Sequence, residues 1–302
     1  MAHTFLKPSV IAKTALGLLQ REIVLPALVW RDAAPDFTGA FNDTVSLRVP
    51  ARAKARRLAL RDRTNPIVTD DLTETKVDVS LDTHVYHAAS VTDEELSLDI
   101  SSFGEQILAP QVRAIAEDIE DQVAAEMTGA TYATSLVLDA NKPENTLVDA
   151  RAALNKQNVP MSERFVVVGT DMESLFLKAD ALKRVNESGS DSVLTEAKLG
   201  RLRGFDIYVS NALPAGVGFA FHRSAYVLSM RAPAVPDGAT FGQSESYASM
   251  AMRWLRDYDA AYLRDRSVVS VFTGTNVVAD GPDGPDAGTA PDFVRAVKLT
   301  LV

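Results

Sequence analysis

Residues Lys198 to Pro214 read KLGRLRGFDIYVSNALP, and this stretch indicates most directly how the chain folds. Its order predicts a helix end, two glycines, one strand and a turn that stops at Pro214. Gly200 and Gly204 have the spacing of a membrane helix-pairing motif, but this segment is polar and carries arginines. We therefore expect the two glycines to cap a helix and open a turn. With no nucleophile, metal cluster or phosphate loop beside it, the unit is expected to supply shape rather than reactivity.

The composition narrows the class of protein. Of the 302 residues, 46% are apolar, which is normal for a folded globular chain. There is no cysteine, so disulfides, thiolate metal sites and cysteine nucleophiles are excluded. No apolar run is long enough to cross a bilayer, and the N-terminal stretch lacks a clean signal-peptide core, so we expect no membrane association. The net charge of −9 gives the whole chain no electrostatic attraction for nucleic acid.

A projecting arm is predicted between residues 41 and 90. Apolar and polar residues alternate over Thr44–Val49 and again over Lys76–Tyr86, which is typical of strands. The two segments flank a basic run and a turn-rich tip, and strands of roughly 15 residues would extend about 50 Å. A ribbon of two strands is marginally stable alone in water, so we expect a neighbouring copy of the chain to support it.

The charges suggest where that support lies. The basic run on the arm could bind nucleic acid, but it lacks the interleaved aromatic residues of single-strand binders. We therefore favour docking on an acidic surface of an adjacent subunit. The expected contact residues are Arg52, Lys54, Arg56, Arg57, Arg61 and Arg63 on the arm, with Glu117, Asp118, Glu120 and Asp121 on a helix.

The remaining elements alternate helix and strand. An apolar stripe with steps of three or four residues predicts a long helix from Pro110 to Gly129. Residues 1–40 are interpreted as an amphipathic N-terminal arm, and residues 145–235 as an α/β unit. The last block returns to strands, with Trp254 in the core and a turn at Asp257–Asp259.

Candidate catalytic and metal-binding residues are few. His84 and His87 would face opposite sides of a strand, so they are not expected to share a metal. His222 has no partner signature. Asp257 and Asp259 could serve a carboxylate-dependent hydrolase, but a turn explains them better. We expect no catalytic residue, no cofactor and no metal site.

Three segments carry a resemblance to a known family: NVPMSERFVVVGTDM (158–172), LGRLRGFDIYVSNALP (199–214) and MRWLRDYD (252–259). Together with the order of elements, they resemble the major capsid (coat) protein of tailed bacteriophages, of the podovirus type. The resemblance implies an α+β fold of the Hong Kong 97-like class. Its implied divisions are an N-terminal arm (1–40), an extended β-loop (41–90), a peripheral domain with a spine helix (91–144), an axial domain (145–235) and returning peripheral strands (236–302).

The same resemblance implies a structural, non-enzymatic function. Such a protein assembles from pentamers and hexamers into an icosahedral head that encloses double-stranded DNA, held by non-specific contacts. The implied partners are further copies of the chain, a scaffolding protein, a portal protein and possible decoration proteins. The implied location is the virion, after assembly in the host cytoplasm. An encapsulin-like nanocompartment shell is the alternative within the same fold.

Overall fold

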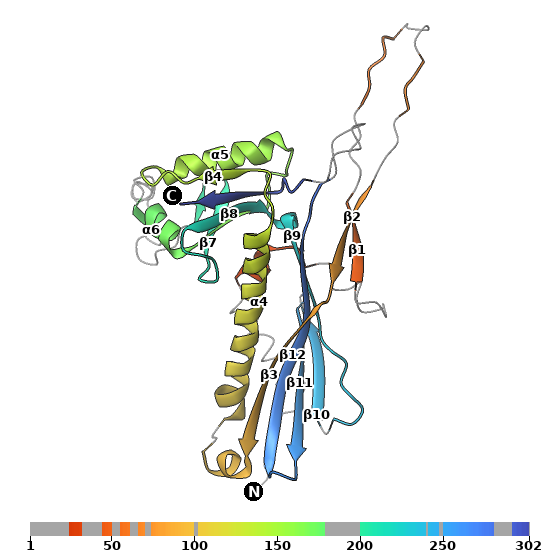
Figure 1. The fold of residues 1–302 in the computed structure, drawn as a ribbon, viewed down its shortest axis with the longest axis vertical. Helices are drawn as coiled ribbons and strands as arrows, with labels where there is room; N and C mark the ends of the chain where they lie inside the picture. The colour runs from red at the N-terminus through yellow and green to blue at the C-terminus, as the bar shows by residue number, and fades with distance from the viewer. Residues whose placement is uncertain are drawn as a thin grey trace.

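The computed structural model describes residues 24–31, 44–49, 55–60, 66–69, 74–99, 102–178, 200–239, 241–247, 250–280 and 292–301. An α/β part sits at one end of a long helix, a second sheet runs beside that helix, and a pair of strands projects from their junction (Figure 1). The expected α+β class is therefore confirmed. The expected N-terminal arm lies largely outside the described residues.

The α/β part is built on a six-stranded sheet in the order β4-β13-β8-β5-β7-β6. β5 pairs parallel with β7 and antiparallel with β8. Val166 and Val168 face one core with the helices, while Val167 faces a second core, so both faces of β5 are covered. That two-sided burial explains why its sequence is an unbroken apolar run. The elements are β4 (Ser135–Val137), α5 (Pro143–Lys156), β5 (Arg164–Val168), α6 (Thr170–Lys178), β6 (Arg201–Leu202), β7 (Phe205–Val209), β8 (Val217–His222) and β13 (Ala296–Thr300).

The second sheet has five strands and lies along helix α4 (Figure 1). Its path is β10-β11-β12-β3, and β9 also pairs with β12. The predicted apolar stripe of α4 is buried and packs on Val85, Trp254 and Val269 of this sheet. The elements are β3 (Thr83–Thr92), α4 (Ala109–Gly129), β9 (Tyr226–Arg231), β10 (Phe241–Tyr247), β11 (Met250–Asp259) and β12 (Arg264–Val277). Short helical turns at Glu95–Asp99, Gly104–Leu108 and Arg223–Ala225 complete the connections.

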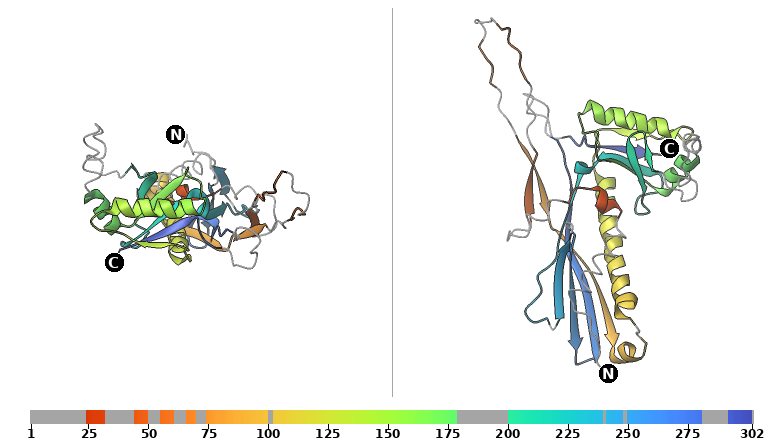
Figure 2. Two further views of the ribbon diagram at one scale, coloured as in Figure 1. Left: turned by 90° about the horizontal axis from the view of Figure 1, so that it is seen from above. Right: turned by 180° about the vertical axis from the view of Figure 1, so that it is seen from behind.

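The projecting arm begins with β1 (Thr44–Val49) and β2 (Thr75–Ser80), which pair antiparallel. Their apolar residues Leu47, Val77 and Val79 form a small core with Val227 and Val278 of the body. Trp30, just after the short helix α2 (Leu25–Leu28), packs against the same core. The base of the arm is therefore covered by its own chain, which the sequence analysis did not anticipate. Beyond this base, the arm extends away from the body (Figures 1 and 2).

Two boundaries differ from the sequence-based expectation. The alternating segment Lys76–Tyr86 is not one strand, because the chain leaves β2 at Ser80 and enters β3 at Thr83. β3 pairs with β12 along Thr83–Thr92 and so belongs to the five-stranded sheet rather than to the arm. The predicted turn at Asp257–Asp259 is wrong as well. These residues end β11 and pair with β12, and the chain reverses after Asp259.

Gly274 makes the crossing between β2 and β12 possible. A Cβ atom at this position would lie 1.8 Å from the backbone oxygen of Ser80. That oxygen cannot move without disturbing the base of the arm, because Ser80 also pairs with Thr44. A glycine is required here for close approach of two backbones.

We expect Gly274→Ala to lower the free energy of unfolding by about 2 kcal/mol or more, since an added methyl group must displace backbone. Urea unfolding of the unassembled chain measures this loss. Gly129→Ala is the matched control, because a Cβ there meets nothing within 4 Å. Equal unfolding midpoints for the two variants would contradict this account of the crossing.

Candidate functional site

Residues 200–214 form a corner of the six-stranded sheet, while the expected helix end before Gly200 lies outside the described residues. Gly200 and Gly204 have φ values of 60° and 92°, in the left-handed region that glycine adopts freely. Arg151 of α5 donates to the carbonyl oxygen of Arg203 at 3.1 Å and so holds the β6–β7 turn. At the other end, the carbonyl oxygen of Pro214 accepts from Val217 N at 3.0 Å. The left-handed glycines and these hydrogen bonds fix the backbone of this corner.

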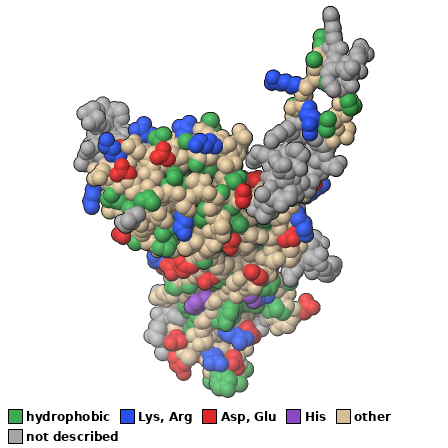
Figure 3. Space-filling view, turned by 45° about the horizontal axis from the view of Figure 1, so that its top comes forward, with side chains coloured by type: hydrophobic (Ala, Val, Ile, Leu, Met, Phe, Trp, Pro, Cys, Tyr) green, Lys and Arg blue, Asp and Glu red, His purple; other side chains and the backbone are tan. Residues whose placement is uncertain are grey.

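The outer part of the arm presents apolar side chains to solvent. Leu60 is 98% exposed and Ile67 is 81% exposed, and Leu58 and Val68 are also exposed. Figure 3 shows hydrophobic and basic side chains on this projecting part of the molecule. Of the six predicted basic contact residues, the structure describes Arg56 and Arg57, and both are exposed. Arg52, Lys54, Arg61 and Arg63 lie outside the described residues.

The four predicted acidic residues of α4 are not equivalent. Glu117, Asp118 and Asp121 are exposed along one side of the helix. Glu120 is half-buried and accepts a hydrogen bond of 2.8 Å from the Ser210 hydroxyl of the α/β part. Glu120 therefore joins two parts of the same chain, while the other three face outward. Glu117 also pairs with Arg113 one turn away, at 3.2 Å.

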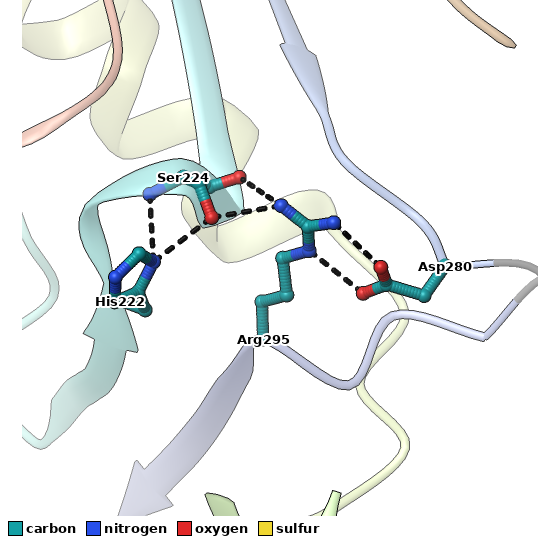
Figure 4. Close-up of polar contacts among 4 residues, drawn as sticks. All are labelled: His222, Ser224, Asp280 and Arg295. Atoms are coloured by element: carbon teal, nitrogen blue, oxygen red, sulfur yellow. Dashed lines mark hydrogen bonds and ion pairs between the residues drawn. The ribbon is translucent and has the colours of Figure 1, made fainter. Parts of the chain in front are cut away.

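A polar cluster joins the α/β part to the segment that follows β12 (Figure 4). Arg295, just before β13, binds both carboxylate oxygens of Asp280 at 2.7 and 2.5 Å. Its remaining nitrogen donates to the Ser224 hydroxyl at 2.8 Å. The side chain of Asp280 is only 6% exposed, so this ion pair is largely removed from water. We call Arg295, Asp280, Ser224 and His222 the junction cluster.

His222 is bound to Ser224 within this cluster. Its Nδ1 accepts from Ser224 N at 3.2 Å and lies 2.8 Å from the Ser224 hydroxyl. Burial lowers the pKa of His222, Glu163 opposes this shift, and Arg295 and Arg164 add to it. A cavity of about 310 Å³ opens beside the cluster, lined by Trp30, Arg48 and Arg223 among others. The cluster holds three chain segments together: residues 222–224, the segment after β12 and the start of β13.

The other predicted residues fall in structural positions. Trp254 is buried under α4, and its indole nitrogen donates to the Ser267 hydroxyl at 2.9 Å. Asp257 pairs with Arg266 at 2.8 Å and Asp259 with Arg264 at 3.3 Å, as cross-strand ion pairs. Among the residues that the structure describes, no group of three or more metal-ligating side chains comes together. Across those same ranges, every helix is too short or too polar to traverse a lipid bilayer.

Sequence reasoning missed the junction cluster. Asp280 and Arg295 flank a Gly/Pro/Asp-rich loop, and neither residue belongs to a periodic pattern. The one available signal was His222 within a strand-like apolar segment, since a buried histidine requires a polar partner. That partner, Ser224, is two residues away.

The chain matches a protein family and several solved structures. The profile of the family described as "Phage capsid protein" matches residues 73–284. Among solved structures, a protein of Mycobacterium phage Che8 has a TM-score of 0.64 and 19% identity, covering 92% of this chain and 90% of that chain. The capsid of Ralstonia phage GP4 gives a TM-score of 0.58 at 11% identity, with coverages of 86% and 84%.

A virus-like particle from Pyrococcus furiosus gives a TM-score of 0.51 at 12% identity, covering 96% of this chain and 98% of that chain. At these identities the solved structures establish a shared fold. No curated sequence matches the chain significantly.

We expect Arg295→Met to lower the free energy of unfolding by about 3–5 kcal/mol, because it removes the arginine that binds both oxygens of the buried Asp280 carboxylate. The matched control is Arg266→Met, which breaks an exposed cross-strand pair and should cost about 0–1 kcal/mol. Urea unfolding measures both. Similar losses for the two variants would show that the junction cluster does not anchor the fold.

The lowered pKa of His222 predicts a pH dependence of stability. Below about pH 6.5 the unfolded chain binds a proton at this histidine before the folded chain does, so stability is full above that pH and falls as the pH decreases. His84 contributes in the same direction, because burial and then Arg253 lower its pKa. Unfolding curves for His222→Gln and His84→Gln, taken between about pH 7 and 5, should each lose part of this slope. An unchanged slope in His222→Gln would exclude the proposed cause.

Proposed function

This chain belongs to the phage capsid protein family and is a structural major capsid protein of Hong Kong 97-like fold, and from that premise we propose how it builds a shell. We propose that pentamers and hexamers of the chain form an icosahedral head that encloses double-stranded DNA. The observation that carries this proposal is the projecting arm, whose apolar tip residues are exposed in the single chain.

The energies of apolar burial and of exposed ion pairs indicate how the arm would bind a second copy. Fully burying a leucine or isoleucine side chain stabilises by about 1.5–3 kcal/mol. An exposed ion pair contributes about 0–1 kcal/mol and weakens with salt. The attraction between the arm and a second copy therefore comes mainly from side chains such as Leu60 and Ile67. The charges of Arg56 and Arg57, opposite the exposed acidic residues of α4, select where the arm docks.

The corner from Gly200 to Pro214 has a different place in this assembly. We assign it to the centre of the five- or six-membered ring, where copies meet around an axis. Its backbone is fixed by left-handed glycines and by Arg151, so it can repeat the same contact in every copy. Closed rings of one chain require such a contact to be heterologous and repeatable.

Besides further copies of the chain, other partners are proposed because the chain belongs to this family. They are a scaffolding protein, a portal protein, decoration proteins and packaged double-stranded DNA, with assembly in the host cytoplasm. The net charge of −9 limits the DNA contact to local basic segments. The proposed role is not enzymatic, since Asp257 and Asp259, the residues considered for hydrolysis, are engaged by arginines.

Negative-stain microscopy of the purified chain tests the proposal. The wild-type chain should form closed particles, and Leu60→Ser combined with Ile67→Ser should abolish them because the main apolar contact is lost. Arg56→Glu with Arg57→Glu should raise the concentration needed for assembly several-fold, and Glu117→Arg with Asp118→Arg should restore it.

Met161→Ser is the matched control, since Met161 is 62% exposed but lies off the arm. Assembly that survives loss of the apolar tip would contradict the role given to the arm. Particles isolated from producing cells that hold a cargo enzyme, instead of packaging partners and DNA, would favour the nanocompartment alternative.

A further inference from the structure

The cavity beside the junction cluster lies where the base of the arm meets the body. Its volume of about 310 Å³ is in the range of small-molecule sites. Leu47 and Val77 reach it from the two strands of the arm base, and Arg223 reaches it from the turn that follows β8. Trp30 and Val278 complete the wall from the segments after α2 and after β12. A molecule bound here would therefore contact the arm base and the body at once.

Part of the cavity wall is apolar. Leu47, Val77 and Val278 belong to the small core under the arm, and Trp30 packs against that core. These side chains favour a ligand with an apolar body, because its binding removes apolar surface from water on both partners. A hydrated inorganic ion would make no use of this part of the wall.

The rest of the wall is polar and mostly basic. Its residues are Arg48, Arg223, Arg295, His222, Ser224 and the single acid Glu163. Arg295 already uses its nitrogens on Asp280 and Ser224. Donors for a ligand therefore come mainly from Arg223 and His222.

Arg223 has a donor without an acceptor. Its terminal Nη1 donates to Glu163 at 3.1 Å. Its Nε is buried and has no hydrogen-bond partner among the described residues. A buried N–H group is costly when unpaired, and an anionic oxygen is its strongest acceptor. His222 adds a second donor, because its Nδ1 accepts from Ser224 N and the imidazole N–H is therefore at Nε2.

We propose that this cavity binds a small organic anion, in which a carboxylate or phosphate group is attached to an apolar body. The anionic group accepts from Arg223 and His222, and the body packs on Trp30 and the core under the arm. An inorganic anion would leave the apolar wall in water, and a neutral apolar molecule would leave the Nε of Arg223 unpaired. The inference goes beyond the proposed shell function and concerns the single chain, so it does not depend on assembly.

Isothermal titration calorimetry of the full-length, unassembled chain tests the site with probes that separate the two parts of the ligand. Benzoate and phenyl phosphate carry both parts, inorganic phosphate carries only the anion, and benzyl alcohol carries only a neutral apolar body. At least one of the first two should bind with a Kd of about 1 mM or tighter, and each partial probe should bind at least ~10-fold more weakly.

Tryptophan fluorescence locates the bound probe. The chain has two tryptophans, Trp30 at the cavity and Trp254 in the core with α4. Binding should change the emission of the wild-type chain, and Trp30→Phe should remove that change. In the wild-type chain the amides of β1 and β2 should exchange roughly 10-fold more slowly at about ten times Kd, because the probe ties the arm base to the body.

Arg223→Gln removes the guanidinium that holds the unpaired donor and should weaken binding at least ~10-fold. Arg113→Gln is the matched control, because it breaks an Arg–Glu pair of 3.2 Å on α4, outside the cavity, and should leave the affinity unchanged. The exchange measurement on the wild-type chain decides the matter if Arg223→Gln does not fold.

Three results would overturn the site. They are no saturable binding of benzoate or phenyl phosphate up to ~10 mM, equal effects of the two arginine substitutions, and a partial probe that binds as tightly as the complete ones. Failure of the chain to form particles would leave this inference standing, since each measurement uses the unassembled chain.

Discussion

A ribbon of two strands is marginally stable in water unless another surface covers its apolar face. At its base, β1 and β2 have such a surface, because Leu47, Val77 and Val79 pack on the body of the same chain. Further out, Leu60 and Ile67 stand almost fully in water. A chain that anchors the arm firmly and leaves its tip uncovered is complete only in contact with other copies. Its membership of the phage capsid protein family supplies the setting in which such contacts repeat.

Polar and aromatic contacts hold the parts of the body together, while other surfaces of the chain are exposed. Arg295 and Asp280 hold the start of β13 to the end of the segment that follows β12, and Glu120 holds α4 to Ser210. The buried hydroxyls of Tyr132 and Tyr226 lie 2.7 Å apart where the two sheets meet, and Tyr132 stacks on Phe219. These polar and aromatic contacts favour a single arrangement of the two parts. The arm, the edge of β3 and the outward acidic residues of α4 are in contrast exposed.

Much of the fold could be predicted from local patterns, and the exceptions have physical reasons. The stripe Ile115, Ile119, Val123 and Met127 predicts α4, because one helix face meets one core. Alternation over Lys76–Tyr86 misled, since β2 and β3 share a period but pair with strands far apart in sequence. Which carboxylates of α4 face outward could not be known either, because Glu120 meets a serine 90 residues away. Long-range pairing leaves no local signal, and the ion pair of Arg295 with Asp280 was missed for the same reason.

Amide hydrogen exchange measures whether other copies cover the arm. Residues 55–60 and 66–69 should exchange almost without protection in the dilute, unassembled chain. In assembled particles the amides of residues 55–60 should exchange roughly 100-fold more slowly or more, because another copy then covers this part of the arm. Strong protection of these amides in a dilute monomer, or its absence in intact particles, would contradict the claim that other copies cover the arm.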